Sequence, residues 1–426
     1  MLHETIIARR GFLGALVAGG ALLHSGAALA LVKASESYPA LDAFIRGFVA
    51  RKQLPGALAT VGKGATAPHV IAVGTIANDS EKQVDIDTLW RLYSMTKPVT
   101  GMAAMILIGD GKLALDQPLS DFLPAFAKMK VLKSANGPVN ETVDARTQIT
   151  IRHLLTHTAG LGYNIIQSGP IKDAYVREGI LPGQVSRISI PGLDTGTPAP
   201  SLEEFADRLA TLPLVYEPGT KWSYSVGLDL MGRVIELASG MPFDQYLSQR
   251  IFTPLAMKSS FFRVPQSQVA RLTTNYAPLG PLLMPIDVGS NSIYLDTPAF
   301  PFGGSGLVGS ARDYDRFQAM LLGEGAIGDV RIMAPETARL GMSNLLPAGV
   351  DTKGSFVDGE GFGAGGRVGL TGGPREGVYG WAGAAGTIGW VDRKRGLRIA
   401  AYAQYMPAEA LPFQSGVPAA IARDLA

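Results

Sequence analysis

Residues 92–98 read Leu-Tyr-Ser-Met-Thr-Lys-Pro, and this stretch decides how the chain is interpreted. Ser94 and Lys97 stand three positions apart, so at the start of a helix their side chains share one face and can reach each other. Pro98 fixes that register, because proline keeps all hydrogen bonds only in a helix's first turn. A serine becomes a nucleophile when a base takes its proton. The stretch predicts a helix that begins close to Ser94 with a nucleophile and base at its start; a serine cap before a surface lysine is the structural alternative.

The residues that follow Lys97 indicate a buried central helix up to about Asp110, because Met102 to Leu107 are almost all apolar. Gly111 ends it. Hydrophobic periodicity predicts further helices at 38–54, 151–156, 202–210, 228–239, 243–251 and 412–425. Strands are predicted at 57–61, 70–76, 386–391 and 397–405.

Strands near both ends of the chain enclose a helical middle, which suggests an α/β domain split by a helical insertion. The predicted fold class is α/β plus all-α. We expect the α/β domain at 31–93 and 305–426 and the mainly helical domain at 94–304. Within the latter, residues 163–200 carry many Gly and Pro and read as a lid-like loop.

The composition excludes several classes of protein. The chain has 426 residues, of which 46% are hydrophobic and 17% charged, a balance that can bury a large core. Lys and Arg number 38 against 36 Asp and Glu, so a nucleic-acid partner is disfavoured. The absence of cysteine excludes disulfides, thiolate catalysis and Cys-ligated metals.

The N-terminal segment 1–30 resembles a twin-arginine signal peptide. Arg9 and Arg10 precede an apolar run that ends in the small-residue pattern Ala28-Leu29-Ala30. We expect export to the periplasm with cleavage near Ala30. The run at 11–23 is too short for a membrane span, so no stable membrane insertion is expected after cleavage; an uncleaved anchor is the alternative.

Two further motifs could suggest a cofactor or a metal. Gly361-x-Gly363-x-x-Gly366 matches a dinucleotide fingerprint, but the glycines and Pro374 that follow forbid the required helix. Residues 359–390 therefore read as a flexible loop that leads into an edge strand. His153 and His157 have the spacing of a zinc pair but lack the central glutamate of such motifs. We expect neither a cofactor nor a metal.

A second candidate for proton transfer is Tyr224, in the stretch Trp222-Ser223-Tyr224-Ser225 just before a predicted helix. A tyrosine hydroxyl can relay a proton between a nucleophile and a leaving group. Considered alone, the position of Tyr224 favours an ordinary half-buried aromatic residue without a chemical role.

Five motifs in order carry a family resemblance. They are Leu92-Tyr93-Ser94-Met95-Thr96-Lys97, Gly109-Asp110-Gly111-Lys112-Leu113-x-Leu115-Asp116-x-Pro118, Ile149-Thr150-Ile151-Arg152-His153-Leu154-Leu155-Thr156-His157-Thr158-Ala159-Gly160-Leu161, Pro218-Gly219-Thr220-x-Trp222-x-Tyr224-Ser225 and Gly303-Gly304-Ser305-Gly306-Leu307. Together they resemble the serine hydrolases related to class C β-lactamases and penicillin-binding proteins, and most of all the family VIII carboxylesterases. The resemblance spans about residues 40–405 and implies a β-lactamase/transpeptidase-like fold, with an antiparallel sheet flanked by helices and a helical insertion domain.

The resemblance also implies roles for individual residues. Ser94 would be the acylated nucleophile, Lys97 its base or proton shuttle, and Tyr224 the second base that protonates the leaving group and activates water. The family's Lys-Thr-Gly-like triplet is matched by Trp381-Ala382-Gly383. The backbone N–H groups of Ser94 and Ala384 would form the oxyanion hole.

The sequence departs from the β-lactamase pattern at two positions. Tyr-x-Asn has become Tyr224-Ser225-Val226, and the lysine of the triplet has become Trp381. Apolar surface thus replaces an amide and a cation, which disfavours β-lactams and suits neutral esters. Arg367 and Arg375 are the cations that could take over the missing role. The expected substrate-binding residues are Trp381, Ala382, Gly383, Val226 and Tyr163.

The sequence therefore predicts a serine carboxylesterase that hydrolyses short-chain neutral esters through an acyl-enzyme on Ser94. The alternatives are a β-lactamase or D-amino peptidase of the same fold, or a penicillin-binding sensor that acylates without turnover. A Ser-His-Asp α/β-hydrolase is disfavoured, because Gly303-Gly304-Ser305-Gly306-Leu307 ends in Leu rather than Gly and no histidine follows His157. The expected partner is a small-molecule ester, and the oligomeric state is not predicted.

Overall fold

The computed structural model describes residues 38–190, 196–280 and 282–426, and the predicted signal peptide at 1–30 lies outside these residues. The helices are α1 Pro39–Ala50, α2 Thr96–Gly109, α3 Ile151–Leu155, α4 Pro170–Arg177, α5 Leu202–Ala210, α6 Gly227–Ser239, α7 Phe243–Leu247, α8 Ala311–Leu322, α9 Pro335–Gly341 and α10 Phe413–Asp424. The strands are β1 Gly56–Lys63, β2 His69–Gly74, β3 Leu89–Arg91, β4 Lys130–Leu132, β5 Thr142–Asp144, β6 Ser260–Phe261, β7 Asn275–Leu279, β8 Leu282–Asp287, β9 Val308–Ser310, β10 Ala326–Ile327, β11 Val330–Arg331, β12 Gly361–Phe362, β13 Arg367–Val368, β14 Val378–Gly383, β15 Thr387–Asp392 and β16 Leu397–Tyr402. None of the described helices combines the length and the apolar character that crossing a bilayer requires.

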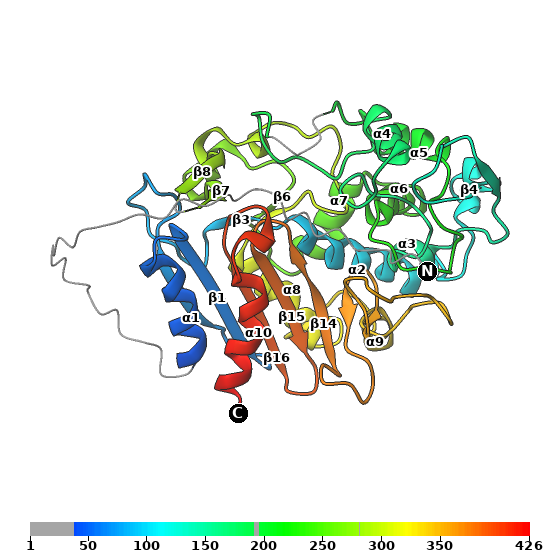
Figure 1. Cartoon of the computed structure of the whole chain (residues 1–426). Coiled ribbons are helices and arrows are strands. Elements are labelled where there is room, and N and C mark those ends of the chain that lie inside the picture. Colours follow the sequence, from blue (N-terminus) through cyan, green and yellow to red (C-terminus); the bar gives the residue numbers. More distant parts are fainter. Residues whose placement is uncertain (1–37, 191–195, 281) are drawn as a thin grey trace, which may run out of the picture. The chain divides into compact units, whose positions relative to one another are not determined.

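The main sheet has seven antiparallel strands in the order β12-β13-β14-β15-β16-β1-β2 (Figure 1). The first strand of the chain pairs with the last, and Leu58 of β1 lies opposite Tyr402 of β16. The two ends of the chain therefore build one sheet, and the helices α2 to α7 belong to the chain between them. This arrangement confirms the predicted antiparallel sheet flanked by helices.

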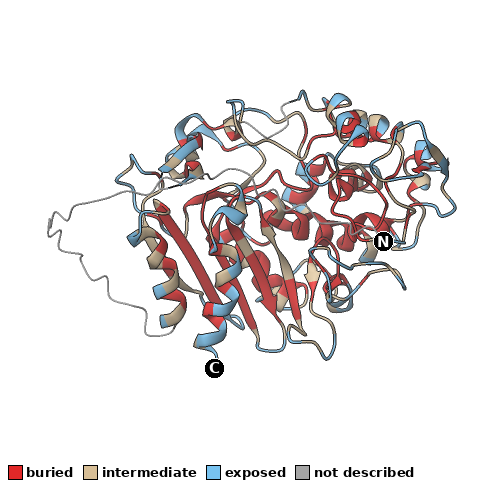
Figure 2. Ribbon diagram, in the orientation of Figure 1, coloured by how far each residue is buried: buried red, intermediate tan, exposed pale blue. Residues whose placement is uncertain are grey.

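Alternating residues of the central strands bury both faces of the sheet. In β1, Ala57 and Ala59 pack in one apolar cluster with α1 and α10, whereas Leu58 belongs to the large core on the other side. Helix α8 lies on that second side against β1, β15 and β16, as Figure 1 shows. The central strands are coloured as buried in Figure 2, while α1 and α10 keep exposed outer faces.

Helix α2 is the buried central helix that the sequence predicts. Every residue from Thr96 to Leu107 is buried, because the helix is apolar on all sides and neighbours surround it. A single 3₁₀ turn, Tyr93–Met95, precedes it, so Pro98 is the third residue of the helix and keeps the predicted place in its first turn. Gly111 follows the helix in the left-handed region at φ +72°.

Two expectations need correction. The segment 163–200 is not loop throughout, since its described part contains α4, where Ile171, Ala174 and Tyr175 are buried at helical spacing. The many Gly and Pro residues around this short helix hid the helical spacing of its apolar residues. The middle of the chain also holds the short strands β4 to β8. The described residues 38–190, 196–280 and 282–426 belong to one compact unit, and the proposed domain division stays a prediction.

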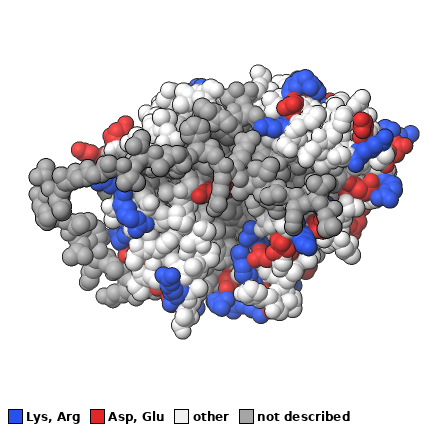
Figure 3. Space-filling model, in the orientation of Figure 1, with Lys and Arg blue, Asp and Glu red and all other residues white. Residues whose placement is uncertain are grey.

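Charged side chains of both signs lie beside one another on the face drawn in Figure 3. Many form exposed ion pairs, such as Arg312 with Asp87 at 2.7 Å and Arg250 with Asp110 at 2.8 Å. Exposed pairs of this kind contribute about 0–1 kcal/mol each. Their mixing differs from the single-sign surface that phosphate binding uses.

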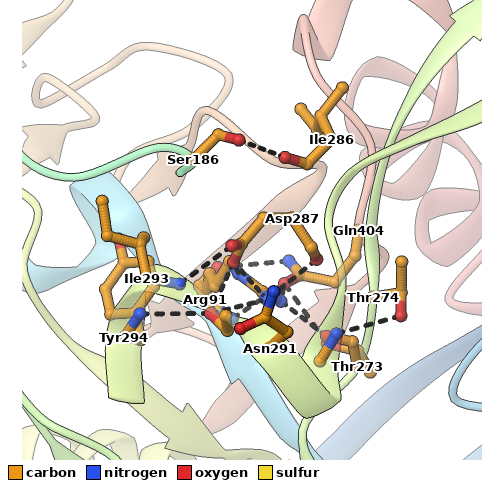
Figure 4. Close-up of polar contacts among 12 residues, drawn as sticks. Arg91, Ser186, Thr273, Thr274, Ile286, Asp287, Asn291, Ile293, Tyr294 and Gln404 are labelled. Carbon is orange, nitrogen blue, oxygen red and sulfur yellow. Dashed lines mark hydrogen bonds and ion pairs between the residues drawn. The ribbon is translucent and has the colours of Figure 1, made fainter. Parts of the chain in front are cut away.

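A buried polar network fixes the strand that leads to Ser94 (Figure 4). Arg91, at the end of β3, is completely buried, and its Nε donates to Asp287 Oδ2 at 2.7 Å. Its Nη1 donates to the carbonyl of Thr273 at 2.7 Å, and its backbone N–H donates to Gln404 Oε1 at 2.9 Å. The network therefore joins β3 to the β7–β8 hairpin and to the segment after β16.

We predict that Arg91→Met lowers the free energy of unfolding by about 3–5 kcal/mol, because Asp287 would be left as a buried, unpaired carboxylate. Urea unfolding measures this change. Arg312→Met is the matched control, since it removes an ion pair whose side chains are 52% and 45% exposed, and it should cost less than about 1 kcal/mol. Equal losses in the two variants would contradict the structural role of Arg91.

Candidate active site

The turn before α2 presents Ser94 to the site. Tyr93 has a left-handed φ of +44°, which is strained for a residue with a side chain. Its ring is buried and packs edge-on against Tyr294 at 6.3 Å, and the N–H of Leu92 is held by the carbonyl of Leu307 at 2.9 Å. Ser94 is partly exposed although its neighbours in sequence are buried, so this turn directs one hydroxyl outward.

Ser94, Lys97 and Tyr224 meet at one oxygen atom. Lys97 Nζ lies 3.1 Å from Ser94 Oγ, one helical turn away. The Tyr224 hydroxyl, which is 130 positions further along the chain, donates to the same Oγ at 2.7 Å. Of the three residues, Ser94 is partly exposed, whereas Lys97 and Tyr224 are buried. Ser94 therefore lies between two buried groups that can exchange protons with it.

Lys97 is completely buried and is held from several sides. Its Nζ donates to the carbonyl of Gly304 at 2.7 Å and lies 4.5 Å from the centre of the Tyr224 ring and 5.6 Å from that of Tyr163. Glycine is needed at 304, because a Cβ there would lie 2.6 Å from Asp229 Oδ2. This close approach to α6 lets the carbonyl of residue 304 reach the lysine.

Aromatic rings surround Tyr224. The rings of His157, Tyr163 and Trp381 have their centres 4.8, 5.4 and 5.7 Å from its own. Trp381 Nε1 also donates a hydrogen bond to the Tyr224 hydroxyl at 3.1 Å. The tryptophan that replaces the family's lysine is thus an apolar wall, as expected, and a polar contact that the sequence did not indicate.

The end of β14 lies against the backbone that precedes Ser94. A Cβ on Gly383 would lie 2.2 Å from the carbonyl oxygen of Leu92, so only glycine allows this approach. Thr387, opposite Gly383 in the β14–β15 pair, donates its hydroxyl to the same carbonyl at 3.2 Å. The exposed Ala384 follows directly, next to the turn that carries Ser94.

The remaining residues expected to bind substrate differ in their surroundings. Ala382 is partly exposed on β14, beside Trp381. Tyr163 is 2% exposed and contacts Tyr224 and Lys97 with its ring. Val226 is completely buried as the residue that caps the start of α6, with its N–H bonded to the carbonyl of Gly162 at 3.2 Å. The structure therefore places Val226 in the core under the site, and its contact with substrate stays a prediction.

Arg367 and Arg375, the two cations of the glycine-rich segment, share an ion-pair partner. Arg367 Nε lies 3.1 Å from Glu360 Oε2, and Arg375 Nη1 lies 3.3 Å from Glu360 Oε1. The Arg367 guanidinium also stacks over the ring of Trp381 at 5.3 Å. Both positive charges are thus partly compensated within the fold.

The two histidines of the zinc-like spacing take part in the fold. His153 Nδ1 accepts the backbone N–H of Thr150 at the start of α3, and burial lowers the pKa of His153 to about 4. His157 Nδ1 lies 3.0 Å from Ser225 Oγ, and burial together with the charge of Lys97 lowers the pKa of His157 well below its usual value. Over 38–190, 196–280 and 282–426 there is no group of three or more metal-ligating side chains.

Asp229, in the first turn of α6, is a site residue that the sequence analysis missed. It is completely buried, and its Oδ1 accepts the N–H of Gly304 at 2.8 Å. Burial raises the pKa of Asp229 to about 6, although the charge of Lys97 opposes this rise. Because the carbonyl of Gly304 holds Lys97, Asp229 positions the group that positions the lysine. An acidic residue in a largely apolar helix, five positions after Tyr224, was the available signal.

We predict that Asp229→Asn gains stability relative to the natural chain as the pH rises from about 4 to about 7. A folded-state pKa of about 6 against 3.8 favours the protonated form, so this stabilisation is complete below pH 3.8 and is lost as the pH passes 6. The shift corresponds to roughly 3 kcal/mol. Asparagine keeps an oxygen for Gly304 and has no titration. Urea unfolding at several pH values tests this, and a pH-independent difference between the two chains would contradict it.

Comparisons with known proteins agree with the motifs. The family model described as Beta-lactamase matches residues 41–414. An uncharacterized protein of Mycobacterium tuberculosis is 35% identical over 368 residues, which cover 83% of this chain and 86% of the relative. Esterase EstB of Burkholderia gladioli is 30% identical over 378 residues, or 84% of this chain and 88% of the esterase.

Among solved structures, EstCE1, described as a hydrolase with promiscuous acyltransferase activity, superposes with a TM-score of 0.72 at 26% identity. The match covers 90% of this chain and 97% of EstCE1. These findings confirm the resemblance inferred from the five motifs. The chain belongs to the Beta-lactamase family and is a serine hydrolase with the β-lactamase/transpeptidase fold.

Proposed function

We propose that this protein is a carboxylesterase that hydrolyses short-chain neutral esters through an acyl-enzyme on Ser94. The observation that carries the proposal is the meeting of Lys97 Nζ and the Tyr224 hydroxyl at Ser94 Oγ, at 3.1 and 2.7 Å. An esterase needs a nucleophile, a group that takes its proton and a group that protonates the leaving alcohol. These three residues supply all three.

In the acylation step, Ser94 Oγ attacks the ester carbonyl carbon while its proton passes to the unprotonated amine of Lys97 or to the phenolate of Tyr224. The tetrahedral oxyanion is held by the backbone N–H groups of Ser94 and Ala384, each worth about 3–4 kcal/mol in comparable hydrolases. The C–O bond to the alcohol then breaks, and Tyr224 gives a proton to the departing alkoxide, which leaves Tyr224 as the phenolate. The acyl group remains on Ser94 as an ester.

In the deacylation step, water replaces the alcohol. Tyr224 takes a proton from the water as its oxygen attacks the acyl carbon, and the same oxyanion hole holds the second tetrahedral intermediate. The bond to Ser94 Oγ breaks, and the serine regains its proton from Lys97 or Tyr224. The hydrogen bond from Trp381 Nε1 to the Tyr224 hydroxyl stabilises negative charge on this oxygen during both steps.

The exchange of the family's lysine for Trp381 favours neutral substrates. Trp381 stands where the β-lactam-binding lysine would be, and the single carboxylate of Glu360 compensates one of the two charges of Arg367 and Arg375. A β-lactam carboxylate that is buried without a partner costs several kcal/mol. A neutral ester carries no such group, and the name of the relative EstB, an esterase, accords with this substrate class.

Export through the twin-arginine route, with cleavage near Ala30, is part of the proposal. Arg9 and Arg10 followed by an apolar run and Ala28-Leu29-Ala30 support it. The esters would then be met in the periplasm.

We predict that Ser94→Ala abolishes hydrolysis without a loss of fold, because it deletes one small, partly exposed group. A fluorophosphonate probe followed by peptide mass spectrometry should find the adduct on Ser94. Ser225 and Ser305 are 1% and 5% exposed and serve as internal comparisons. An adduct on either of them, or full activity of Ser94→Ala, would refute the assignment of the nucleophile.

We predict that acetate to about hexanoate esters exceed any β-lactam in kcat/KM by at least roughly two to three decades, at about 1.4 kcal/mol per decade. Weak turnover of a cephalosporin is compatible with this, because the same three residues can attack an activated amide. Both substrate classes are measured on one preparation, with Ser94→Ala as the blank. Penicillin turnover equal to or faster than that of a butyrate ester would show that a cation such as Arg367 binds the carboxylate.

A further inference from the structure

Phe356 is exposed to solvent and also contacts Tyr224. Its side chain is 55% exposed, yet its ring packs edge-on against the ring of Tyr224, with centres 5.9 Å apart and planes at 86°. It also meets Trp222 at 6.3 Å and 82°. An exposed aromatic side chain on a catalytic residue lies where that residue is approached from solvent.

The loop that carries Phe356 is held in place by contacts at both ends. Asp351 exchanges backbone hydrogen bonds with the strand-like segment before Tyr224, through Trp222 N and Thr220 O, both at 2.9 Å. Arg367 Nη2 donates to the carbonyl of Phe356 itself at 2.6 Å. Val357, the next residue, is completely buried. The ring is therefore presented to solvent from a fixed backbone.

We propose that Phe356 selects the alcohol part of the ester, favouring apolar and aromatic alcohols. This inference rests on the proposed function, in which Tyr224 protonates the departing alkoxide. The alcohol must then leave next to the Tyr224 hydroxyl, while the acyl group stays on Ser94. Phe356 packs on Tyr224, so the ring can cover an apolar alcohol during acylation. Once the alcohol has left, the deacylation step no longer depends on this contact.

Four substrates separate the two halves of the ester: the methyl and benzyl esters of acetate and of butyrate, followed by pH-stat. Phe356→Ala should lower kcat/KM for both benzyl esters by about tenfold, because a ring contact and buried apolar area are lost. Both methyl esters should stay within about twofold of the natural enzyme. Phe356→Trp, which keeps a ring at this position, should retain the benzyl activity.

Val330→Ala is the matched control, since Val330 is 41% exposed on β11 and is placed in no part of the site; it should leave all four values unchanged. Three results for Phe356→Ala would overturn the proposed role of Phe356. They are a loss of kcat/KM that depends on the acyl group rather than on the alcohol, an equal loss for all four esters, and no loss at all. If the natural enzyme cleaves none of the four esters, the proposed function fails instead, so the two failures are distinguishable.

Discussion

The constraint on which the site depends is the complete burial of Lys97 beside Ser94, the proposed nucleophile. Taking an amine out of water is unfavourable unless fixed dipoles replace the lost hydration. Here the Gly304 carbonyl, the Ser94 hydroxyl and the faces of two tyrosine rings supply that replacement. Gly304 and the buried Asp229 serve the same purpose. The glycine allows its backbone to lie close to Asp229, and Asp229 accepts the Gly304 N–H and so holds the carbonyl that contacts Lys97.

The turn Tyr93–Met95, which carries Ser94, is held in place by separate contacts on its two sides. After the turn, helix α2 is buried from Thr96 to Leu107 and cannot shift without disturbing the core. Before the turn, Arg91 at the end of β3 donates hydrogen bonds to Asp287 and Gln404, which lie far away in the sequence. The strained Tyr93 lies between these two anchors, which over-determine its conformation.

The sequence revealed those parts of the site that are local or that form a family pattern. The spacing of Ser94 and Lys97 together with Pro98 predicted their contact, and the resemblance added Tyr224. Asp229 and Phe356 could not be found in this way, because their relation to Lys97 and Tyr224 exists only through tertiary contacts. Helix α4 was missed for a different reason: the helix is short, and the Gly and Pro residues around it hide the helical spacing of its apolar residues. Strands β1, β2, β15 and β16 were predicted from their β-rich sequence near the two chain ends, and the resemblance implied that the sheet is antiparallel.

The exchange of lysine for tryptophan in the triplet changes more than the charge. A lysine at 381 would place a positive charge near the buried Lys97 amine and attract an anionic substrate. The indole instead donates one neutral hydrogen bond to the Tyr224 hydroxyl and closes the ring of aromatic side chains around it. In the proposed mechanism, proton transfer among Ser94, Lys97 and Tyr224 would take place against apolar walls, where each fixed dipole acts more strongly than in water. The exchange thus removes a cation from the triplet and adds a hydrogen bond that holds the Tyr224 hydroxyl.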